Sequence, residues 1–144
     1  LLARETFSNM ILHSQTVLTP HPGEAAEMLQ ITAKEIQKNR IKSAKELQKK
    51  YGCIIVLKGN GTIICDKNNV YLCSSGGPEL AVAGSGDVLS GVIGSLMAQG
   101  LAPIDAAITG VGIHAQAGEE FAKDVGKIGL AAGELIPYIR KFLN

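Results

Sequence analysis

Hydrophobic and polar positions follow a helical repeat in one stretch of the chain and an unbroken apolar run in the next. Ile41, Ala44 and Leu47 recur at three-residue steps among lysines, which predicts an amphipathic surface helix. We expect this helix to cover Arg40–Lys50. The apolar run Cys53–Leu57 comes next, and such a run is typical of a strand buried on both faces of a parallel sheet.

Shorter β-rich runs occur on both sides of this expected strand. Thr16–Thr19 is an extended run that Pro20 stops. Thr62–Cys65 and Val70–Cys73 are separated by the turn-forming residues Asp66–Asn69. Turn residues between two β-rich runs predict a hairpin.

Helix-start signals mark two further elements near the N-terminal end. Pro22 and Gly23 fit a turn that opens a helix over Glu24–Leu29. Thr32 and Glu35 have the spacing of a capping box, in which each side chain bonds the main-chain amide of the other residue.

The last third of the chain is rich in small residues and has a helical repeat. An apolar face recurs from Val88 to Met97, and Gly100 ends that helix. Pro103 suits the first turn of a helix that runs to about Ala122. A last helix should cover about Ala131–Phe142, with Pro137 kinking or restarting it. The order of helix, strand, hairpin and helices predicts an α/β domain.

Length and composition fit a folded domain rather than a disordered or membrane-spanning chain. The 144 residues are 46% hydrophobic and 19% charged, with a formal net charge of +1. Basic and acidic residues are interleaved, so binding of nucleic acid is not expected. No apolar run approaches the roughly 18 residues that a membrane span needs. The chain begins Leu1-Leu2-Ala3-Arg4-Glu5, without an initiator Met or a signal-peptide pattern, so we expect a fragment of a longer chain.

The three cysteines, Cys53, Cys65 and Cys73, fit neither a disulfide framework nor a zinc site. Their number is odd, and none has CxxC spacing. All three lie in or beside apolar strand patterns, so we expect small buried thiols and a reducing, cytoplasmic compartment.

The run Ala83-Gly84-Ser85-Gly86-Asp87 stands just before the helix that should start near Val88. Glycines let the backbone approach a ligand, and a helix N-terminus favours phosphate or developing negative charge. Asp87 has two interpretations: a carboxylate that caps the helix or complements its dipole, or a general base for phosphoryl transfer to a substrate hydroxyl. The run is neither a Walker A motif nor G-x-G-x-x-G.

A second cluster, Lys58-Gly59-Asn60-Gly61-Thr62, follows the strand expected to be buried. Ligands of open α/β sheets collect beyond the carboxyl ends of strands, where this loop must lie. Its amides, its lysine and its hydroxyl could hold the phosphate or ribose of a nucleotide. An ordinary glycine turn leading into the hairpin is the alternative.

A third cluster, Thr19-Pro20-His21-Pro22-Gly23-Glu24, also follows a strand. Two prolines restrict the backbone on either side of His21, so the imidazole is held ready to bond a ligand. Glu24 could act in a site or cap the next helix, and a purely structural turn is the alternative. His13 and His114 lack partners at metal-ligand spacing, so we expect them to be ordinary helix or surface residues.

In their order and spacing, the three clusters resemble the NAD(P)H-hydrate dehydratases. The matching runs are Leu18–Glu24, Val56–Thr62 and Gly84–Gly91, and the resemblance extends from about Val17 to the C-terminus. It implies a ribokinase-like α/β fold, a three-layer sandwich whose central, mostly parallel sheet is flanked by helices. Residues 1–144 would be a single partial domain, the C-terminal half of such a dehydratase.

The resemblance also implies a metabolite-repair reaction, the dehydration of hydrated NADH or NADPH at the expense of ADP or ATP. The ring hydroxyl would be phosphorylated and the phosphate would then leave. Asp87 would be the catalytic base, and His21 and Asp87 would contact the hydrated cofactor. The amides of Gly84, Ser85 and Gly86 would form an anion hole. Mg²⁺ would accompany the nucleotide without dedicated protein ligands, and the nucleotide would be bound by Lys58, Gly59, Asn60, Gly61, Thr62 and Gly86.

The chain departs from the family pattern in two ways. Family members often carry Asn-Pro-Gly-Met-Ala where this chain has Gly77-Pro78-Glu79-Leu80-Ala81, and they are longer than this chain. The missing N-terminal half would therefore be a partner of these residues, and the resemblance alone implies a homo-oligomer. Two other functions stay open: a ribokinase-like kinase for a small molecule such as a vitamin precursor, and a non-catalytic ADP/ATP-binding module.

Overall fold

The computed structural model describes residues 11–143 of the chain. The N-terminal stretch Leu1–Glu5, which led us to expect a fragment, lies outside these residues. The chain divides into two compact units, the first ending at Leu72 and the second beginning at Cys73. A single partial domain over residues 1–144 stays a prediction.

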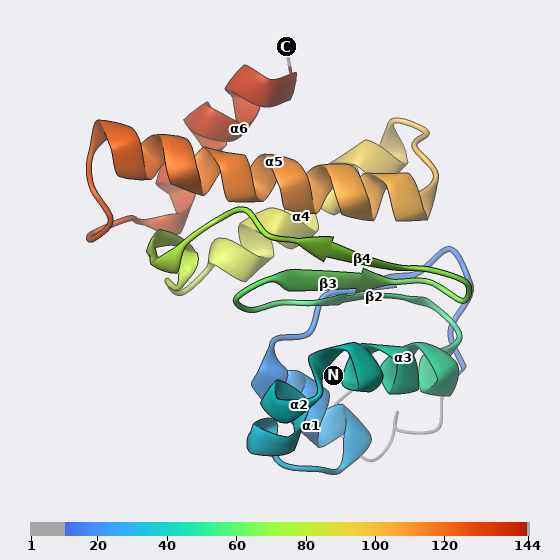
Figure 1. Ribbon diagram of the computed structural model, residues 1–144. Coiled ribbons are helices and arrows are strands. Elements are labelled where there is room, and N and C mark those ends of the chain that lie inside the picture. The colour runs from blue at the N-terminus through green and yellow to red at the C-terminus, as the bar shows by residue number, and fades with distance from the viewer. Residues whose placement is uncertain (1–10, 144) are drawn as a thin grey trace. The chain divides into compact units, whose positions relative to one another are not determined.

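The first unit combines a four-stranded sheet with three helices (Figure 1). β1 and β2 are parallel, with Val17 opposite Ile54, whereas β2 and β3 are antiparallel, with Val56 opposite Ile64. Figure 1 shows β3 and β4 running in opposite directions, and the three helices on one face of the sheet. The strands follow the order β1 (Val17–Leu18), β2 (Ile54–Leu57), β3 (Thr62–Cys65) and β4 (Val70–Cys73), and the helices are α1 (Pro22–Leu29), α2 (Ala33–Lys38) and α3 (Arg40–Tyr51).

Burial of β2 on both faces confirms the expectation from its unbroken apolar run. All four of its residues are buried, whereas the residues of β4 are exposed or half-buried. Ala44, Leu47 and Tyr51 of α3 belong to the same hydrophobic core as Ile55 and Leu57 of β2.

The predicted amphipathic helix is confirmed, but Ile41, one of its three recurring apolar positions, does not share the buried face of α3. Its side chain is 53% exposed, whereas Ala44 and Leu47 are fully buried. A helix turns about 100° per residue, so a strict three-residue step drifts around the axis and leaves the first position at the edge of the apolar face.

The turn signals of the first unit form as expected. Thr32 Oγ1 accepts a hydrogen bond from the Glu35 amide at 3.2 Å, and Glu35 Oε2 accepts one from the Thr32 amide at 2.8 Å. These two hydrogen bonds confirm the capping box at the start of α2. The hydrogen bonds that the Glu35 carboxylate accepts from the Thr32 amide and, at 2.7 Å, from Thr32 Oγ1 lower the pKa of that carboxyl. In the hairpin, Asp66 Oδ1 accepts hydrogen bonds from the amides of Asn68 and Asn69, which closes the turn.

The second unit is built from helices, with α5 packed against both α4 and α6. Phe121 of α5 meets Tyr138 of α6 edge to face, with ring centroids 5.9 Å apart. The restart predicted at Pro137 is confirmed in the form of a 3₁₀ turn followed by a new helix, in which Pro137 occupies the first turn, where its missing amide proton costs nothing. The elements of the second unit are η2 (Pro78–Leu80), α4 (Ser85–Ala98), α5 (Pro103–Asp124), η3 (Ala132–Glu134) and α6 (Leu135–Leu143). Its core contains Ile113, Ala117, Phe121, Leu130, Leu135 and Ile139.

Helix α4 begins at Ser85, three residues before the expected start near Val88, so the glycine run forms its first turn. Within residues 11–143, no helix has the length and apolar character needed to cross a membrane.

The cysteines are free thiols with different environments. Cys53 and Cys65 are buried as expected, whereas Cys73 is only half-buried because it ends the more exposed strand β4. Burial raises the pKa of the Cys53 thiol to about 11 and also raises that of Cys65.

We predict that alkylation by iodoacetamide at pH 8 will modify Cys73 well before Cys53. A thiol with a pKa of about 11 has roughly one thousandth of its population as thiolate at pH 8, and only the thiolate reacts. Site-resolved mass spectrometry should show the Cys53 rate rising tenfold per pH unit. Equal Cys53 rates in the folded protein and in urea would contradict this prediction.

Candidate functional site

His21 follows β1 and is the N-terminal cap of α1. Its Nδ1 accepts a hydrogen bond from the Glu24 amide at 3.1 Å, and Glu24 Oε2 accepts one from the His21 amide at 2.7 Å. Because Nδ1 is an acceptor, the neutral ring carries its proton on Nε2, which lies 3.6 Å from Glu24 Oε2. Glu24 thus caps the start of α1, which is one of the two roles expected for it. The His21 side chain remains 57% exposed and is held in one orientation, as its two flanking prolines suggested.

The loop Lys58–Thr62 lies beside the His21 turn. The Lys58 amide donates a hydrogen bond to the Pro20 carbonyl at 2.9 Å, just beyond the ends of the parallel strands β1 and β2. Two of the three sequence clusters are therefore neighbours at the carboxyl edge of the sheet, as the position of each after a strand predicted. Within the loop, Thr62 Oγ1 donates to the Gly59 carbonyl at 3.3 Å.

The glycine run Gly84-Ser85-Gly86 turns its amides toward one side of the α4 N-terminus. Gly84 has a left-handed φ of 83°, and Ser85 begins the right-handed helix. A left-handed residue followed by a helical one forms a concave group of successive amides that favours an anion. The Ser85 amide already donates to the Val82 carbonyl at 3.3 Å. The amides of Gly84 and Gly86 have no hydrogen-bond partner among residues 11–143, so they are the stronger donors for a ligand.

Asp87 differs from three of the four other acidic residues that stand three positions after a helix cap; the fourth, Asp105 of α5, likewise makes no side-chain hydrogen bond among residues 11–143. Glu24, Glu35 and Glu134 each stand three residues after a cap and accept a hydrogen bond from the amide of that cap residue. Asp87 stands three residues after Gly84, yet no side-chain hydrogen bond of Asp87 occurs in the described part of the chain. Its exposed carboxylate therefore does not close a capping box and lies in the first turn beside the unpaired amides.

His114 of α5 contacts the glycine run, and sequence reasoning missed this contact. We expected an ordinary helix or surface residue, but His114 is only 8% exposed. Its Nε2 lies 3.0 Å from the Ser85 carbonyl oxygen and 3.2 Å from Ser85 Oγ. A carbonyl oxygen can only accept, so Nε2 carries a proton and donates to it. His114 therefore anchors the residue at the centre of the glycine run.

The segment that departs from the family pattern has a structural explanation. Glu79, which is 3% exposed, accepts a hydrogen bond from the Gly77 amide through Oε1 at 2.7 Å. Glu119 of α5 accepts one from the neighbouring Gly76 amide at 2.8 Å. The two carboxylates thus hold the turn that leads to the glycine run.

The described residues therefore form two groups of candidate site residues. His21 and Lys58–Thr62 are brought together in the first unit, and Gly84–Asp87 lie with His114 in the second. Convergence of both groups on one site stays a prediction.

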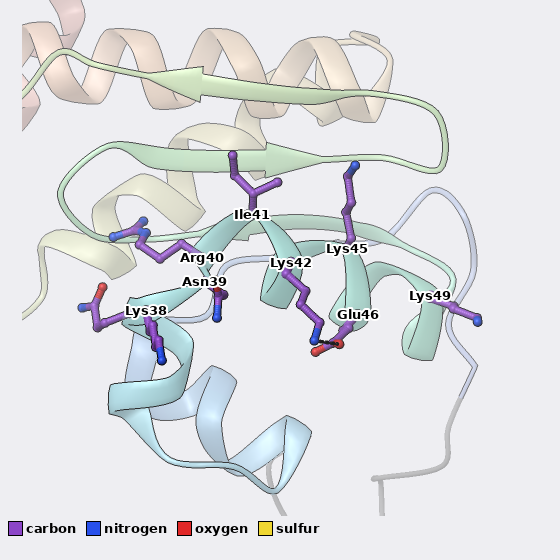
Figure 2. A pocket seen from close by; sticks show the side chains of 9 residues that line it. Lys38, Asn39, Arg40, Ile41, Lys42, Lys45, Glu46 and Lys49 are labelled. Carbon is purple, nitrogen blue, oxygen red and sulfur yellow. Dashed lines mark ion pairs between the residues drawn. The ribbon is translucent and has the colours of Figure 1, made fainter.

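A groove of about 740 Å³ runs along α3, but it is not the site that the motifs indicate (Figure 2). Its lining is basic, with Lys38, Lys45 and Lys49 among its residues, and it includes none of the motif residues. No cluster of three or more His, Cys, Asp or Glu side chains suited to a metal occurs among residues 11–143.

Comparison with known proteins agrees with the motifs. A family model described as NAD(P)H-hydrate dehydratase matches residues 3–141. The bifunctional NAD(P)H-hydrate repair enzyme of Coxiella burnetii is 45% identical over 129 residues, which are 89% of this chain and 26% of that protein. The ADP-dependent (S)-NAD(P)H-hydrate dehydratase of Neisseria meningitidis is 40% identical over 89% of this chain and 44% of its own length.

Solved structures are similar to the chain over the same part. The Bacillus subtilis ADP/ATP-dependent NAD(P)H-hydrate dehydratase, co-crystallised with ATP and Mg²⁺, has a TM-score of 0.84 and 33% identity, over 88% of this chain and 46% of that one. A ribokinase-like superfamily protein of Enterococcus faecalis has a TM-score of 0.75 and 26% identity, over 90% of this chain and 45% of that one. The mixed α/β, ribokinase-like fold is thereby confirmed, and the chain spans less than half the length of each of these relatives.

We predict that His114→Leu will destabilise the second unit by about 1–3 kcal/mol, because the buried Ser85 carbonyl loses its donor. His114→Gln, which keeps an N–H donor on a side chain of similar reach, should restore part of the loss. Urea unfolding of the whole protein measures the free energy of unfolding of both variants, with His13→Leu as the control at an exposed histidine. A loss no greater for His114→Leu than for His13→Leu would rule out the anchoring role.

Proposed function

This chain belongs to the NAD(P)H-hydrate dehydratase family, and we propose that the protein containing it dehydrates hydrated NADH or NADPH at the expense of ADP or ATP. The observation that carries the proposal is the Asp87 carboxylate, exposed and uncapped beside the unpaired amides of Gly84 and Gly86. A base and an anion-binding group at one helix N-terminus are what transfer of a phosphoryl group to a hydroxyl requires.

The proposed chemistry has two steps. Asp87 takes the proton of the ring hydroxyl as the hydroxyl oxygen bonds to the terminal phosphorus of the nucleotide, and the bond from that phosphorus to the nucleotide breaks. The ring carbon–oxygen bond then breaks with phosphate as the leaving group, and loss of a neighbouring C–H proton restores the double bond. The amides of Gly84 and Gly86 stabilise the negative charge that builds up on the transferred group.

The remaining candidate residues divide between the two substrates. Lys58, Gly59, Asn60, Gly61 and Thr62 are proposed to bind the nucleotide, together with Gly86. His21 is proposed to contact the hydrated cofactor through Nε2, the ring nitrogen that the cap leaves as a donor. Since no carboxylate cluster suited to a metal occurs in residues 11–143, Mg²⁺ would be held mainly by the nucleotide's own phosphates.

We propose that these residues act as a partial domain of a longer cytoplasmic enzyme. The N-terminal half of that enzyme would complete the hydrated-cofactor site, and the whole protein is expected to be a homo-oligomer. The three free thiols agree with a reducing compartment.

The activity test supplies the whole protein with hydrated NADH and with ADP or ATP, and follows the return of the reduced-nicotinamide absorbance. Recovery that requires nucleotide is the expected result. A small-molecule kinase would leave the hydrated cofactor unchanged while consuming ATP on another substrate, and a binding module would bind nucleotide without turnover. Nucleotide binding without recovery would refute the dehydratase proposal.

We predict that Asp87→Asn will lower kcat by about 100-fold or more while nucleotide Kd changes less than about threefold. The amide side chain keeps the size of the residue but cannot take the proton. Asp105→Asn is the matched control, because Asp105 is also an exposed acid in the first turn of a helix. If the two variants have equal kcat values, Asp87 acts only on the helix dipole.

A further inference from the structure

Arg40, at the start of α3, donates hydrogen bonds to three main-chain carbonyls of a loop that is distant in the sequence. Its Nη2 donates to the carbonyl oxygens of Leu57 at 3.2 Å, Lys58 at 3.4 Å and Gly61 at 2.9 Å. These acceptors lie 17 to 21 residues further along the chain and include both ends of the turn that follows β2. One guanidinium nitrogen therefore links both ends of the turn to the start of α3.

The direction of the carbonyls determines the direction of the amides. The structure contains no cis peptide among its described residues, and in a trans peptide the carbonyl and the following amide point opposite ways. The Lys58 amide, opposite the Leu57 carbonyl, accordingly points away from Arg40 and reaches the Pro20 carbonyl. The Gly59 amide is opposite the Lys58 carbonyl and has no acceptor among residues 11–143.

The close approach of the guanidinium also explains the glycine beside it. Gly59 has a φ of 139°, a conformation that side chains with a Cβ rarely adopt. A Cβ added at Gly59 would overlap Arg40 Nη1. The loop and the arginine therefore fit one another only when position 59 carries no side chain.

The position of Arg40 carries a cost in free energy. Its Nε is buried without a hydrogen-bond partner among residues 11–143. Burial also lowers the pKa of its guanidinium, which nevertheless stays charged at neutral pH. A buried donor without an acceptor is unfavourable, and such violations concentrate where function requires them.

We propose that Arg40 is a positioning residue for nucleotide binding: by drawing the carbonyls of Leu57, Lys58 and Gly61 inward, it turns the Gly59 amide outward for a phosphate of ADP or ATP. The proposal rests on the nucleotide role of Lys58–Thr62 given above. Arg40 acts through the loop and also places a positive charge behind it. Figure 2 shows its side chain directed away from the nearby Lys42–Glu46 ion pair.

The test compares Arg40→Ala, Arg40→Lys and Arg40→Gln with Lys42→Ala in the whole protein. Lys42 is a matched control because it is an exposed cation on the same helix whose ion-pair partner is Glu46. Arg40→Ala should raise the Kd of ADP and ATP by about tenfold or more, since hydrogen bonds from a charged donor are lost. The KM for hydrated NADH should stay within about twofold, as should the nucleotide Kd of Lys42→Ala.

Two further substitutions separate the effect of the charge of Arg40 from the effect of its hydrogen bonds. Arg40→Lys keeps the charge without the planar fork of donors, and Arg40→Gln keeps an N–H donor without the charge. Recovery of nucleotide affinity in Arg40→Gln above that of Arg40→Ala supports positioning. Affinity restored by Arg40→Lys but not by Arg40→Gln, with Leu57–Ile63 exchange in Arg40→Lys still faster than in the parent protein, would overturn it, because charge would then suffice without hydrogen bonds to the loop. If Arg40→Ala does not fold, Arg40→Lys and Arg40→Gln are compared with the parent protein by the same two measurements.

Amide hydrogen exchange provides a measurement that needs no nucleotide. The peptide spanning Leu57–Ile63 should exchange faster in Arg40→Ala than in the parent protein, with no change in α4. Unchanged exchange there, or nucleotide Kd within twofold of the parent in a folded Arg40→Ala, would overturn the proposal. Absence of ADP and ATP binding by the parent protein would instead reject the proposed function, and the exchange result would still judge the role of Arg40 in shaping the loop.

Discussion

Main-chain polar groups that leave a sheet or a helix still need hydrogen-bond partners, and the loops of this protein depend on how that need is met. The turn after β2 directs three carbonyls at Arg40, and the Ser85 carbonyl at the start of α4 is bonded by His114. The amides of Gly76 and Gly77 are bonded by two glutamates. In each case a side chain bonds main-chain groups that the neighbouring sheet or helix leaves without a partner.

The same arrangement determines which groups remain available to a ligand. The Lys58 carbonyl faces Arg40 and the Ser85 carbonyl faces His114, so the amides that follow them, those of Gly59 in the first unit and Gly86 in the second, point the opposite way. Outward amides bind negatively charged groups without the desolvation cost of a buried lysine. Both loops are therefore suited to phosphate through their main chain, and their glycines matter because they permit the conformations that expose those amides.

Helix N-termini carry the remaining candidate chemistry, but they do so in two different ways. At α1 the cap is complete, because His21 and Glu24 bond one another's amides and the exposed imidazole keeps Nε2 as a donor. At α4 the cap is open, because Gly84 has no side chain and Asp87 does not reach back to its amide. The closed cap holds an exposed imidazole in place, and the open one leaves a carboxylate beside amides that have no partner among residues 11–143.

The family assignment and the geometry support one another at different levels. Similarity to NAD(P)H-hydrate dehydratases covers nearly the whole chain but less than half of each relative described above. The contacts explain why the motif residues of this part are arranged as they are within each unit. A phosphate-binding role for these residues is therefore compatible with completion of the hydrated-cofactor site by the rest of a longer protein.

Local sequence patterns were sufficient to predict most of the helices and strands and to recognise the three motif clusters. The unbroken run before Lys58 indicated a strand buried on both faces, and turn residues located the hairpin at its observed bounds. Capping boxes, prolines and glycines identified most helix ends, because these signals act within a few residues. The three motif clusters were recognised from their order alone.

Only the tertiary structure decided which distant side chains complete those motifs. Arg40 reaches its carbonyls across 17 to 21 residues, and His114 reaches Ser85 across 29. Such contacts leave no periodic or local signal, so nothing in the sequence distinguished His114 from an ordinary helix or surface residue. The sequence by itself determined the elements and the chemistry of the loops, whereas packing decided which side chains hold those loops, because that depends on where the elements meet in space.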